Sequence, residues 1–324
     1  MATYYEINGQ KVQNLASDPS PLAEGQVWYN TTSDTAKVAG YNAAASWASG
    51  GAMNTARRQI GGFGHTQNTA VAVCGQNPPA LALTEEYDGS NWSAVTASPI
   101  ARINPFTNGS LTAGLVGGGE GAPNSNNTAI EYDGTSWATP TSLPQTSQDG
   151  TSVGTQTSAL VCIGVTSPNT AVLYYDGSSW TSGPAATPAR MANASGAGAS
   201  QTSAVVFGAA APTSQTLTIE WDGSSWTSGG SLNTGRDNGG ASVGSPATDV
   251  LFFAGVNPGY SNATEKYDGT SWANQPSMAQ ARRGIGGAGT SGSALAFGGY
   301  NGSDLATTEA FEGSGVTTKT ITAS

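Results

Sequence analysis

The stretch Tyr87-Asp88-Gly89-Ser90-Asn91-Trp92 decides the fold, because its pattern returns along the whole chain. Further copies begin at Tyr132, Tyr175, Trp221 and Tyr267, a decayed copy is Phe311-Glu312-Gly313, and a degenerate one is Tyr41-Asn42 with Ser46-Trp47. The tryptophans at positions 47, 92, 137, 180, 226 and 272 lie 43 to 46 residues apart. This period defines the unit from which the chain is built.

Each unit predicts four strands. Asp-Gly and two small polar residues between an aromatic residue and a tryptophan are typical of a hairpin between a third and a fourth strand. Upstream lies an apolar segment that ends in glycine, such as residues 160–164, and before it a segment rich in Gly, Ser, Thr and Ala. Small residues suit an innermost strand, where sheets crowd a central axis. A four-stranded unit with a period near 45 residues is typical of a β-propeller blade.

Six complete units follow Trp47, and their inner strands are expected to begin near residues 58, 103, 148, 191, 237 and 283. Most units have the same order of features: an arginine, a strand of small residues, an apolar strand that ends in glycine, and an aromatic-acid-Gly hairpin before Trp. This order resembles the kelch family over roughly residues 45–315. The resemblance implies an all-β, six-bladed kelch-like β-propeller over residues 45–324. Two segments compete to close its ring: the one around Trp47, which has the register of an outer strand, and residues 315–321, which alternate like a strand.

Residues 1–44 do not share the repeat and predict a short N-terminal β-hairpin arm. Asn8-Gly9 between two strand-like segments is typical of a hairpin turn, and residues 25–38 predict a second hairpin. Gly25-Gln26-Val27-Trp28-Tyr29-Asn30-Thr31-Thr32 resembles segments of bacteriophage tail and fibre proteins, and the repeated Tyr-Asp-Gly-Thr-Ser-Trp resembles structural proteins of marine phages. The resemblance implies an attachment or oligomerisation arm. A plain β-arm, which is also rich in Tyr, Val, Thr and Asn, is the alternative.

Composition excludes several classes of function. The 324 residues include only 10% charged residues and carry a formal net charge of -10, so a phosphate backbone is an unfavourable partner. No run approaches the ~20 apolar residues that cross a bilayer, and the first residues lack the pattern of a signal peptide. Cys74 and Cys162 fall in equivalent apolar strands two units apart, which predicts buried, unpaired thiols.

An arginine stands ten residues after almost every repeat tryptophan: Arg57, Arg102, Arg190, Arg236 and Arg282, with Ser147 as the exception. One interpretation is a ring of arginines at a channel mouth that binds anions or acidic sugars. The other is structural pairing within or between blades, with acids such as Glu86, Glu131, Glu220, Glu265 or Glu309. Repetition favours pairing, because a binding site needs one asymmetric constellation and a structural bond is needed in every blade.

The repeated hairpins predict structural turns. Their acids are Asp88, Asp133, Asp176, Asp222 and Asp268, and their tryptophans are Trp92, Trp137, Trp180, Trp226 and Trp272. At a turn, Asp accepts hydrogen bonds from nearby backbone N–H groups and Gly adopts a positive φ. No Asp-x-Asp-x-Asp-Gly run is present, so these acids do not predict a calcium loop. The hairpin resembles the Asp-box of sialidases in purpose, with one residue fewer between acid and tryptophan. The tryptophans predict packing between blades, and an exposed member that stacks on a sugar is the alternative.

Known enzyme patterns are missing from the sequence. A copper site like that of galactose oxidase needs two histidines, and His65 is the only one. His65 lies in a glycine-rich inner strand without a nucleophile elbow, and no Walker-type loop occurs. A sialidase site needs three converging arginines, whereas the arginines here follow the repeat. We therefore expect no catalytic, cofactor-binding or metal-binding residues.

The sequence predicts a non-enzymatic phage virion structural protein, located in the virion as a tail, fibre or capsid-surface component. Its expected partners are other virion proteins and further copies of itself, with host-surface glycans as candidate ligands, and neither nucleic acid nor membrane insertion is expected. The alternatives are a cellular kelch-type protein-interaction module and, less favoured, a glycan-acting propeller enzyme. Any specificity is expected in the loops that differ most between units, at residues 76–83, 119–127 and 256–262.

Overall fold

Strands are the regular elements of this protein. The computed structural model describes residues 12–20, 23, 25–42, 44–121, 127–138, 142–164, 170–186, 192–210 and 215–320, and none of these residues lies in an α-helix. The all-β class predicted from the composition is therefore confirmed over the described residues. The chain divides into two compact units: Trp47–Phe311, and a smaller one from the described parts of Met1–Ser46 and Glu312–Ser324.

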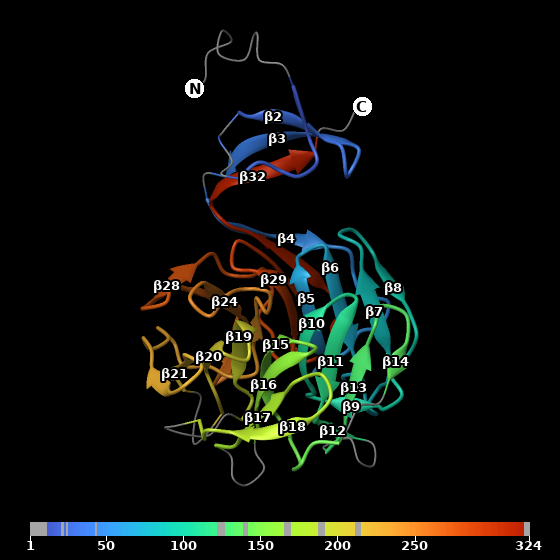
Figure 1. Ribbon diagram of the computed structural model, residues 1–324, viewed down its shortest axis with the longest axis vertical. Helices are drawn as coiled ribbons and strands as arrows, with labels where there is room; N and C mark the ends of the chain where they lie inside the picture. The colour runs from blue at the N-terminus through green and yellow to red at the C-terminus, as the bar shows by residue number, and fades with distance from the viewer. Residues whose placement is uncertain are drawn as a thin grey trace. The chain divides into compact units, whose positions relative to one another are not determined.

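The large unit consists of six four-stranded sheets over the described residues, which we number in chain order (Figure 1). From the innermost strand outward, sheet 1 is β5 (Gly61–Thr66), β6 (Thr69–Val73), β7 (Thr84–Tyr87) and β8 (Trp92–Ala94), and sheet 2 is β10 (Phe106–Ser110), β11 (Ala113–Gly117), β13 (Ala129–Tyr132) and β14 (Trp137–Ala138). Sheet 3 is β15 (Thr151–Thr155), β16 (Ser158–Cys162), β17 (Val172–Tyr175) and β18 (Trp180–Gly183), and sheet 4 is β19 (Ser195–Ser200), β20 (Ser203–Phe207), β21 (Thr218–Trp221) and β22 (Trp226–Ser228). Sheet 5 is β23 (Gly240–Ala241), β24 (Val250–Phe253), β27 (Thr264–Tyr267) and β28 (Trp272–Gln275), and sheet 6 is β29 (Gly286–Thr290), β30 (Ser293–Phe297), β31 (Thr308–Glu312) and β4 (Ser46–Gly50). Two short pairs, β9 (Arg102–Ile103) with β12 (Glu120–Gly121) and β25 (Val256–Asn257) with β26 (Gly259–Tyr260), lie in the connections.

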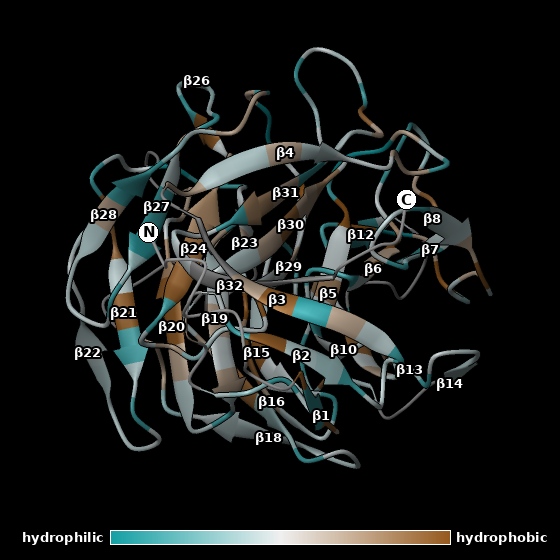
Figure 2. Cartoon of the chain, turned by 90° about the horizontal axis from the view of Figure 1, so that it is seen from above, coloured by the Kyte–Doolittle hydropathy of each residue, from teal (hydrophilic) through white to brown (hydrophobic). Residues whose placement is uncertain are grey.

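The sheets are arranged around a common centre. Their innermost strands contact one another in a closed cycle, from β5 through β10, β15, β19, β23 and β29 back to β5. In the view from above, β8, β14, β18, β22 and β28 lie toward the periphery (Figure 2). This is a β-propeller-like arrangement, in which every sheet packs between two others.

Crowding at the centre explains the small residues of the innermost strands. A Cβ at Gly62 would lie 2.7 Å from the backbone nitrogen of Gly287, and a Cβ at Gly287 would lie 2.4 Å from the carbonyl oxygen of Ala241. Those distances are shorter than van der Waals contact, so glycine is required where β5, β29 and β23 approach one another.

The second strand of each sheet lacks polar side chains over its last four residues, because both of its faces are covered there. All four residues of β24 are buried, as are the last four of β6, β16, β20 and β30. Between sheets 4 and 5, the ring of Phe207 lies 5.0 Å from that of Phe252 and 4.9 Å from that of Trp272. The core is thus divided into layers between neighbouring sheets.

The N-terminal candidate segment closes the ring. β4, which contains Trp47, is the outermost strand of sheet 6 beside β31. Its indole packs 5.2 Å from the ring of Phe311 in the same sheet and 5.2 Å from that of Phe253 in sheet 5. The competing segment, β32 (Gly315–Thr320), pairs with β3 (Thr35–Asn42) instead.

The small unit is one sheet with the order β1 (Gln13–Leu15), β2 (Val27–Asn30), β3 and β32. β2 and β3 form the hairpin expected over residues 25–38, whereas β1 runs parallel to β2. Trp28 is fully buried, and its indole N–H donates to Asp18, which also accepts hydrogen bonds from Asn30 and Lys37 at 2.7 and 2.9 Å. The hairpin expected around Asn8-Gly9 lies outside the described residues. The unit also takes in β32, which the sequence assigned to the propeller.

Candidate functional site

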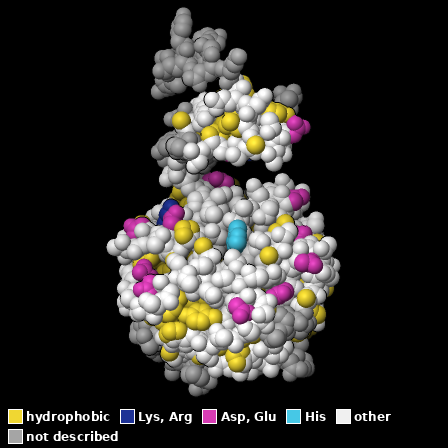
Figure 3. All heavy atoms as spheres, viewed as in Figure 1, with side chains coloured by type: hydrophobic (Ala, Val, Ile, Leu, Met, Phe, Trp, Pro, Cys, Tyr) yellow, Lys and Arg dark blue, Asp and Glu magenta, His cyan; other side chains and the backbone are white. Residues whose placement is uncertain are grey.

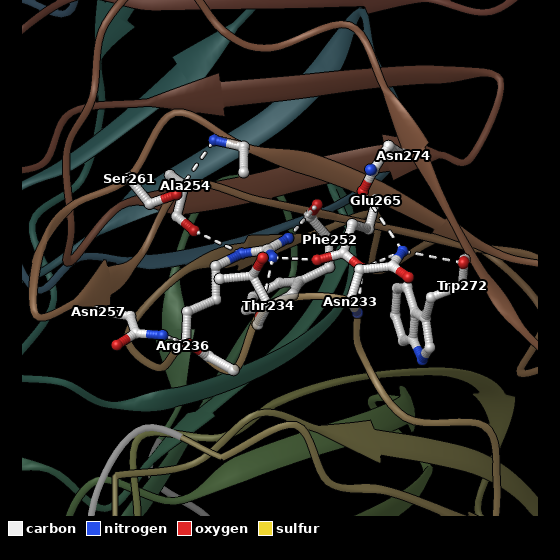
Figure 4. A network of polar contacts seen from close by, with 12 residues as sticks. Asn233, Thr234, Arg236, Phe252, Ala254, Asn257, Ser261, Glu265, Trp272 and Asn274 are labelled. Atoms are coloured by element: carbon white, nitrogen blue, oxygen red, sulfur yellow. Dashed lines mark hydrogen bonds and ion pairs between the residues drawn. The ribbon is translucent and has the colours of Figure 1, made fainter.

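The repeated arginines lie inside the sheets. The side chains of Arg57, Arg102, Arg236 and Arg282 are fully buried, and Arg190 lies outside the described residues. Arg236 is typical: its guanidinium donates to the carbonyl oxygens of Ala254 and Phe252 at 3.0 and 3.2 Å and forms an ion pair with Glu265 (Figure 4). A guanidinium surrounded in this way has no donor directed to solvent. These four arginines therefore do not line an open channel mouth.

A glutamate two residues before the hairpin aromatic pairs with the arginine in three sheets. The ion pairs are Arg57–Glu85, Arg236–Glu265 and Arg282–Glu309. Glu265 and Glu309 are among the acids named as partners from the sequence, but Glu86, Glu131 and Glu220 are not partners of these arginines. They occupy the next position along the strand, which faces the opposite side.

In sheet 2, Ile130 occupies the position of the glutamate, and Arg102 is held by backbone and hydroxyl oxygens. Its guanidinium donates to the carbonyl oxygens of Gly118 and Thr128 at 2.8 and 2.9 Å and to the Thr128 hydroxyl at 2.9 Å. Burial lowers the pKa of Arg102 to about 10, and that of Arg282 also to about 10. Both groups remain charged at neutral pH, so their role is to tie the carbonyl ends of a sheet together.

Tyrosine–glutamate hydrogen bonds join neighbouring sheets. Three hairpin tyrosines donate their hydroxyl to the glutamate just before the aromatic of the preceding sheet: Tyr132 to Glu86 at 2.7 Å, Tyr175 to Glu131 at 2.8 Å, and Tyr267 to Glu220. Burial and then the glutamate raise the pKa of all three tyrosines. In sheets 4 and 6 the hairpin aromatics are Trp221 and Phe311, which lack a hydroxyl, and the preceding sheets carry Tyr174 and Lys266 in place of the glutamate. The three acids are thus used in contacts between sheets.

The hairpin aspartates make local turn contacts. Each accepts backbone N–H groups from the residues two and three positions later; for Asp133 these are Thr135 at 2.8 Å and Ser136 at 2.7 Å. The same pair of bonds is made by Asp88, Asp176, Asp222 and Asp268. The following glycines have φ between 88° and 96°. The backbone donors, led by Ser225, lower the pKa of Asp222 to about 2.

The hairpin tryptophans face the preceding sheet. Trp92 and Trp272 are buried, and their indole N–H groups donate to Thr308 and Thr218 at 2.9 Å. Trp137, Trp180 and Trp226 are half-buried. Trp92 and Trp272 are thus closed to a sugar, whereas the other three tryptophans expose part of their rings.

A ring of polar residues surrounds the centre at one end of the innermost strands. Its members lie two or three residues after each arginine position, and we call them the polar ring: Gln59, Asn104, Asp149, Asn193, Asn238 and Gly284. All six have a positive φ, between 49° and 63°. Asn, Asp and Gly adopt this conformation more readily than other residues, which explains five of the six identities.

Backbone hydrogen bonds link the polar ring. The N–H of Gln59 donates to Gly284, Gly284 to Asn238, Asn238 to Asn193, Asn193 to Asp149, and Asn104 to Gln59, at 2.6 to 3.0 Å. Because the backbone groups bond one another, the side chains are the groups left for other partners. This ring was not predicted from the sequence; the signal that indicates it is a residue that tolerates a positive φ two or three positions after each arginine position.

A cavity of about 110 Å³ is lined by the polar ring and by the first residues of the innermost strands, among them Thr107, Thr151 and Ser195. The Asn104 amide donates to Asp149 Oδ1 at 2.6 Å and to Asn193 Oδ1 at 3.3 Å. Burial raises the pKa of Asp149, and the bond from Asn104 opposes this. The described residues hold no group of three or more His, Cys, Asp or Glu side chains suited to a metal ion.

An aromatic pair flanks the ring beside Gly284. Tyr300 pairs with Arg283, the neighbour of Gly284, and its ring lies 5.9 Å from that of Tyr260 in a T-shaped contact. Arg58 also lies over the Tyr300 ring, 4.6 Å from its centre, and pairs with Asp304 at 2.7 Å. Tyr260 is 40% exposed.

The remaining sequence candidates lie away from this cavity. His65 is near the end of β5 that is remote from Gln59, and it is exposed. Cys74 and Cys162 are fully buried free thiols, and burial raises the pKa of Cys162 to about 12. Within the described residues, no helix is long and apolar enough to cross a membrane.

Comparisons with known proteins support the fold. No model of a protein family matches the chain, and no curated protein matches it. Among solved structures it is similar to one entitled "Structure of YjhT", with a TM-score of 0.65 and 15% identity over 83% of this chain and 99% of that chain. At this identity the similarity shows the fold alone. The chain therefore has an all-β, β-propeller-like fold.

Proposed function

We propose that this chain is a non-enzymatic virion structural protein of a bacteriophage, in which a six-bladed kelch-like β-propeller is displayed from a separate attachment unit. The observation that carries the proposal is the pairing of β3 with β32. The segments that enter and leave the propeller are neighbouring strands of one small sheet, with Lys37 opposite Thr320. A propeller inserted between two paired strands is tethered at two points, which suits display from an assembly.

Six sheets, the closed cycle of inner strands and the arginine in successive units support the six-bladed kelch-like assignment. The resemblance of the N-terminal segment and of the repeat to phage structural proteins supports the virion. The exposed side chain of Val12, beside β1 in the small unit, offers an apolar contact for another virion protein or a second copy of the chain.

The surface of the propeller suits contact with neutral, hydrated partners. The face in Figure 3 is mostly uncharged, with acidic side chains scattered over it and few basic ones. Ser, Thr, Asn and backbone groups at such a surface exchange hydrogen bonds with subunits or with host-surface glycans. Nucleic acid is a poor partner for a chain of net charge -10.

Peptide mass spectrometry of purified phage particles, beside the soluble fraction of the infected-cell lysate, tests the virion assignment. We expect peptides from both units to remain with particles after density-gradient purification, in a constant ratio to the capsid protein. Peptides that are abundant in the lysate and missing from the particles would refute the proposal. Light scattering of the full chain and of Val12→Asp tests the attachment contact, with Thr270→Ala on an exposed hairpin as the control. Self-association that V12D leaves unchanged would exclude Val12 from it.

A further inference from the structure

The polar ring is asymmetric, although the fold repeats. Five positions carry a hydrogen-bonding side chain, of which Asp149 is the one titratable group, and the sixth is Gly284. The contacts that hold the sheets together, such as the arginine–glutamate ion pairs and the hydrogen bonds of the hairpin aspartates, recur in several sheets. A few polar side chains that converge on one central cavity are the pattern expected of a binding site.

The side chains of the ring match hydroxyl groups. Carboxamides offer both donors and acceptors, and a carboxylate accepts. The Asn238 carboxamide makes no hydrogen bond with another described side chain, and Asp149 uses Oδ1 for Asn104. A ligand with several adjacent hydroxyls satisfies such groups in both directions, whereas an anion would lie against the Asp149 carboxylate.

An aromatic surface lies outside the ring, beside the residues that adjoin Gly284 and Asn238. Tyr300 is one backbone pairing from Arg283 and therefore about 5 Å from the strand that carries Gly284. The backbone of Tyr260 pairs with that of Val256 in a short antiparallel ladder. Val256 in turn forms a backbone bridge with Asp237, the residue before Asn238. The two tyrosines thus flank the same part of the ring. An exposed aromatic face is electron-rich and packs against polarised C–H groups, such as those on one face of a sugar ring.

The cavity sets the size of the ligand. Its volume of about 110 Å³ is well below the ~300–1,000 Å³ of pockets that enclose a whole drug-sized molecule. It suits the hydroxyl-bearing edge of one sugar unit, and the rest of that unit lies outside the cavity beside the tyrosines.

We propose that the polar ring, with Tyr260 and Tyr300 at its edge, binds the terminal residue of a neutral saccharide. The hydroxyls of that residue bond to Asn238, Asn193 and Asp149, and its C–H face packs against Tyr260. This inference deepens the glycan-binding part of the proposed function and rests on it. It is tested in solution, so its failure is separate from that of the virion assignment.

Saturation-transfer NMR on the full chain is the experiment, with the methyl glycosides of glucose, galactose and mannose, with N-acetylglucosamine, and with N-acetylneuraminic acid as the anionic arm. We expect transfer to at least one neutral saccharide, with a millimolar dissociation constant. Asn238→Gly removes the amide while keeping the positive φ, as Gly284 does naturally, and Tyr260→Ala removes the aromatic face. Each is expected to weaken binding about fivefold or more, as loss of one hydrogen bond or aromatic contact does.

Thr270→Ala, on an exposed hairpin, is the matched control and should bind like the parent chain. Thermal unfolding of every variant establishes that it is folded, and Tyr260→Ala, at an exposed side chain, tests the site if Asn238→Gly is unstable. The proposal is overturned if no neutral saccharide shows transfer, if only N-acetylneuraminic acid does, or if the folded variants bind as well as the control.

Discussion

Breaking the buried ion pair of sheet 5 should destabilise the propeller far more than breaking an exposed pair beside it. Arg236 and Glu265 have 0% and 1% of their side chains exposed. The second oxygen of Glu265 accepts the backbone N–H and the side-chain amide of Asn233 at 2.7 and 2.9 Å. Glu265 therefore fixes both the arginine and the loop that precedes it.

The expected magnitude follows from what each substitution leaves behind. Glu265→Gln leaves a buried guanidinium with carbonyl partners only, and Arg236→Met leaves a buried carboxylate; each costs about 3–5 kcal/mol. In sheet 2, where Ile130 replaces the glutamate, the Thr128 hydroxyl accepts a hydrogen bond from Arg102. Sheet 5 has no such bond to Arg236 among the described residues, so we expect Glu265→Gln to fall within that range. The double variant should cost clearly less than the sum of the two.

The matched control is the next residue of the same strand. Lys266 pairs with Asp249 at 3.0 Å, with 37% and 46% of the side chains exposed. Lys266→Met should cost no more than about 1 kcal/mol, since water and salt screen an exposed pair. Denaturant unfolding of the four variants measures the differences, and a thermal shift of roughly 6–12 °C corresponds to about 3 kcal/mol in a chain of comparable size. If Glu265→Gln and Arg236→Met cost no more than the control, or if their effects simply add, the account of the buried pair is wrong.

Three further outcomes follow from the structure. Tyr132→Phe should reduce the free energy of unfolding by about 1.5–3 kcal/mol in a denaturant assay, because the Tyr132 hydroxyl donates to Glu86. Tyr87→Phe should cost less in the same assay, because Ala310 occupies the position of that glutamate in the sheet that precedes Tyr87. Cys74 and Cys162 should not react with Ellman's reagent in the native chain and should both react in denaturant, because burial removes access and raises both pKa values. Burial raises the pKa of Asp149 above its ordinary 3.8, so the folded chain binds the proton more tightly and stability falls as pH rises from that value through the folded pKa. Asp149→Asn should thus raise the unfolding temperature relative to the parent near pH 7 and lose this advantage near pH 3, and a difference independent of pH would contradict the assignment.

The hairpins and strands of this protein could be predicted from its sequence. Asp133-Gly134 between an aromatic residue and a tryptophan produces a hairpin because the acid bonds the next backbone N–H groups and glycine accepts a positive φ. Four strands per unit follow from the same pattern together with the apolar segments. Their burial on both faces follows from a continuous apolar run such as β24. These features depend on residues a few positions apart, and a single sequence displays them.

Contacts between residues far apart in the sequence were decided by the tertiary structure. The segment around Trp47 has the register of an outer strand and β32 alternates like a strand; pairing of β4 beside β31 and packing of Trp47 against Phe253 and Phe311 place Trp47 in the ring. Glu85 and Glu86 are adjacent acids of one strand; the first faces Arg57 in its own sheet and the second faces Tyr132 of the next. Because side chains alternate along a strand, the sequence predicts that Glu85 and Glu86 point to opposite faces of their sheet. It does not predict which neighbouring sheet covers each face.

The candidate site shows the same division. The sequence alone contains an Asn, Asp, Gln or Gly two or three positions after each arginine slot, and nothing in one unit shows that these residues meet. Gln59 and Gly284 are 225 positions apart in the chain, yet the N–H of Gln59 donates to the carbonyl oxygen of Gly284 at 2.6 Å. The sequence determined the units and their turns, because local sterics and hydrogen bonding act within each unit. Only closure around the central axis brought one residue from every unit to a common cavity, because that contact depends on the packing of all six sheets.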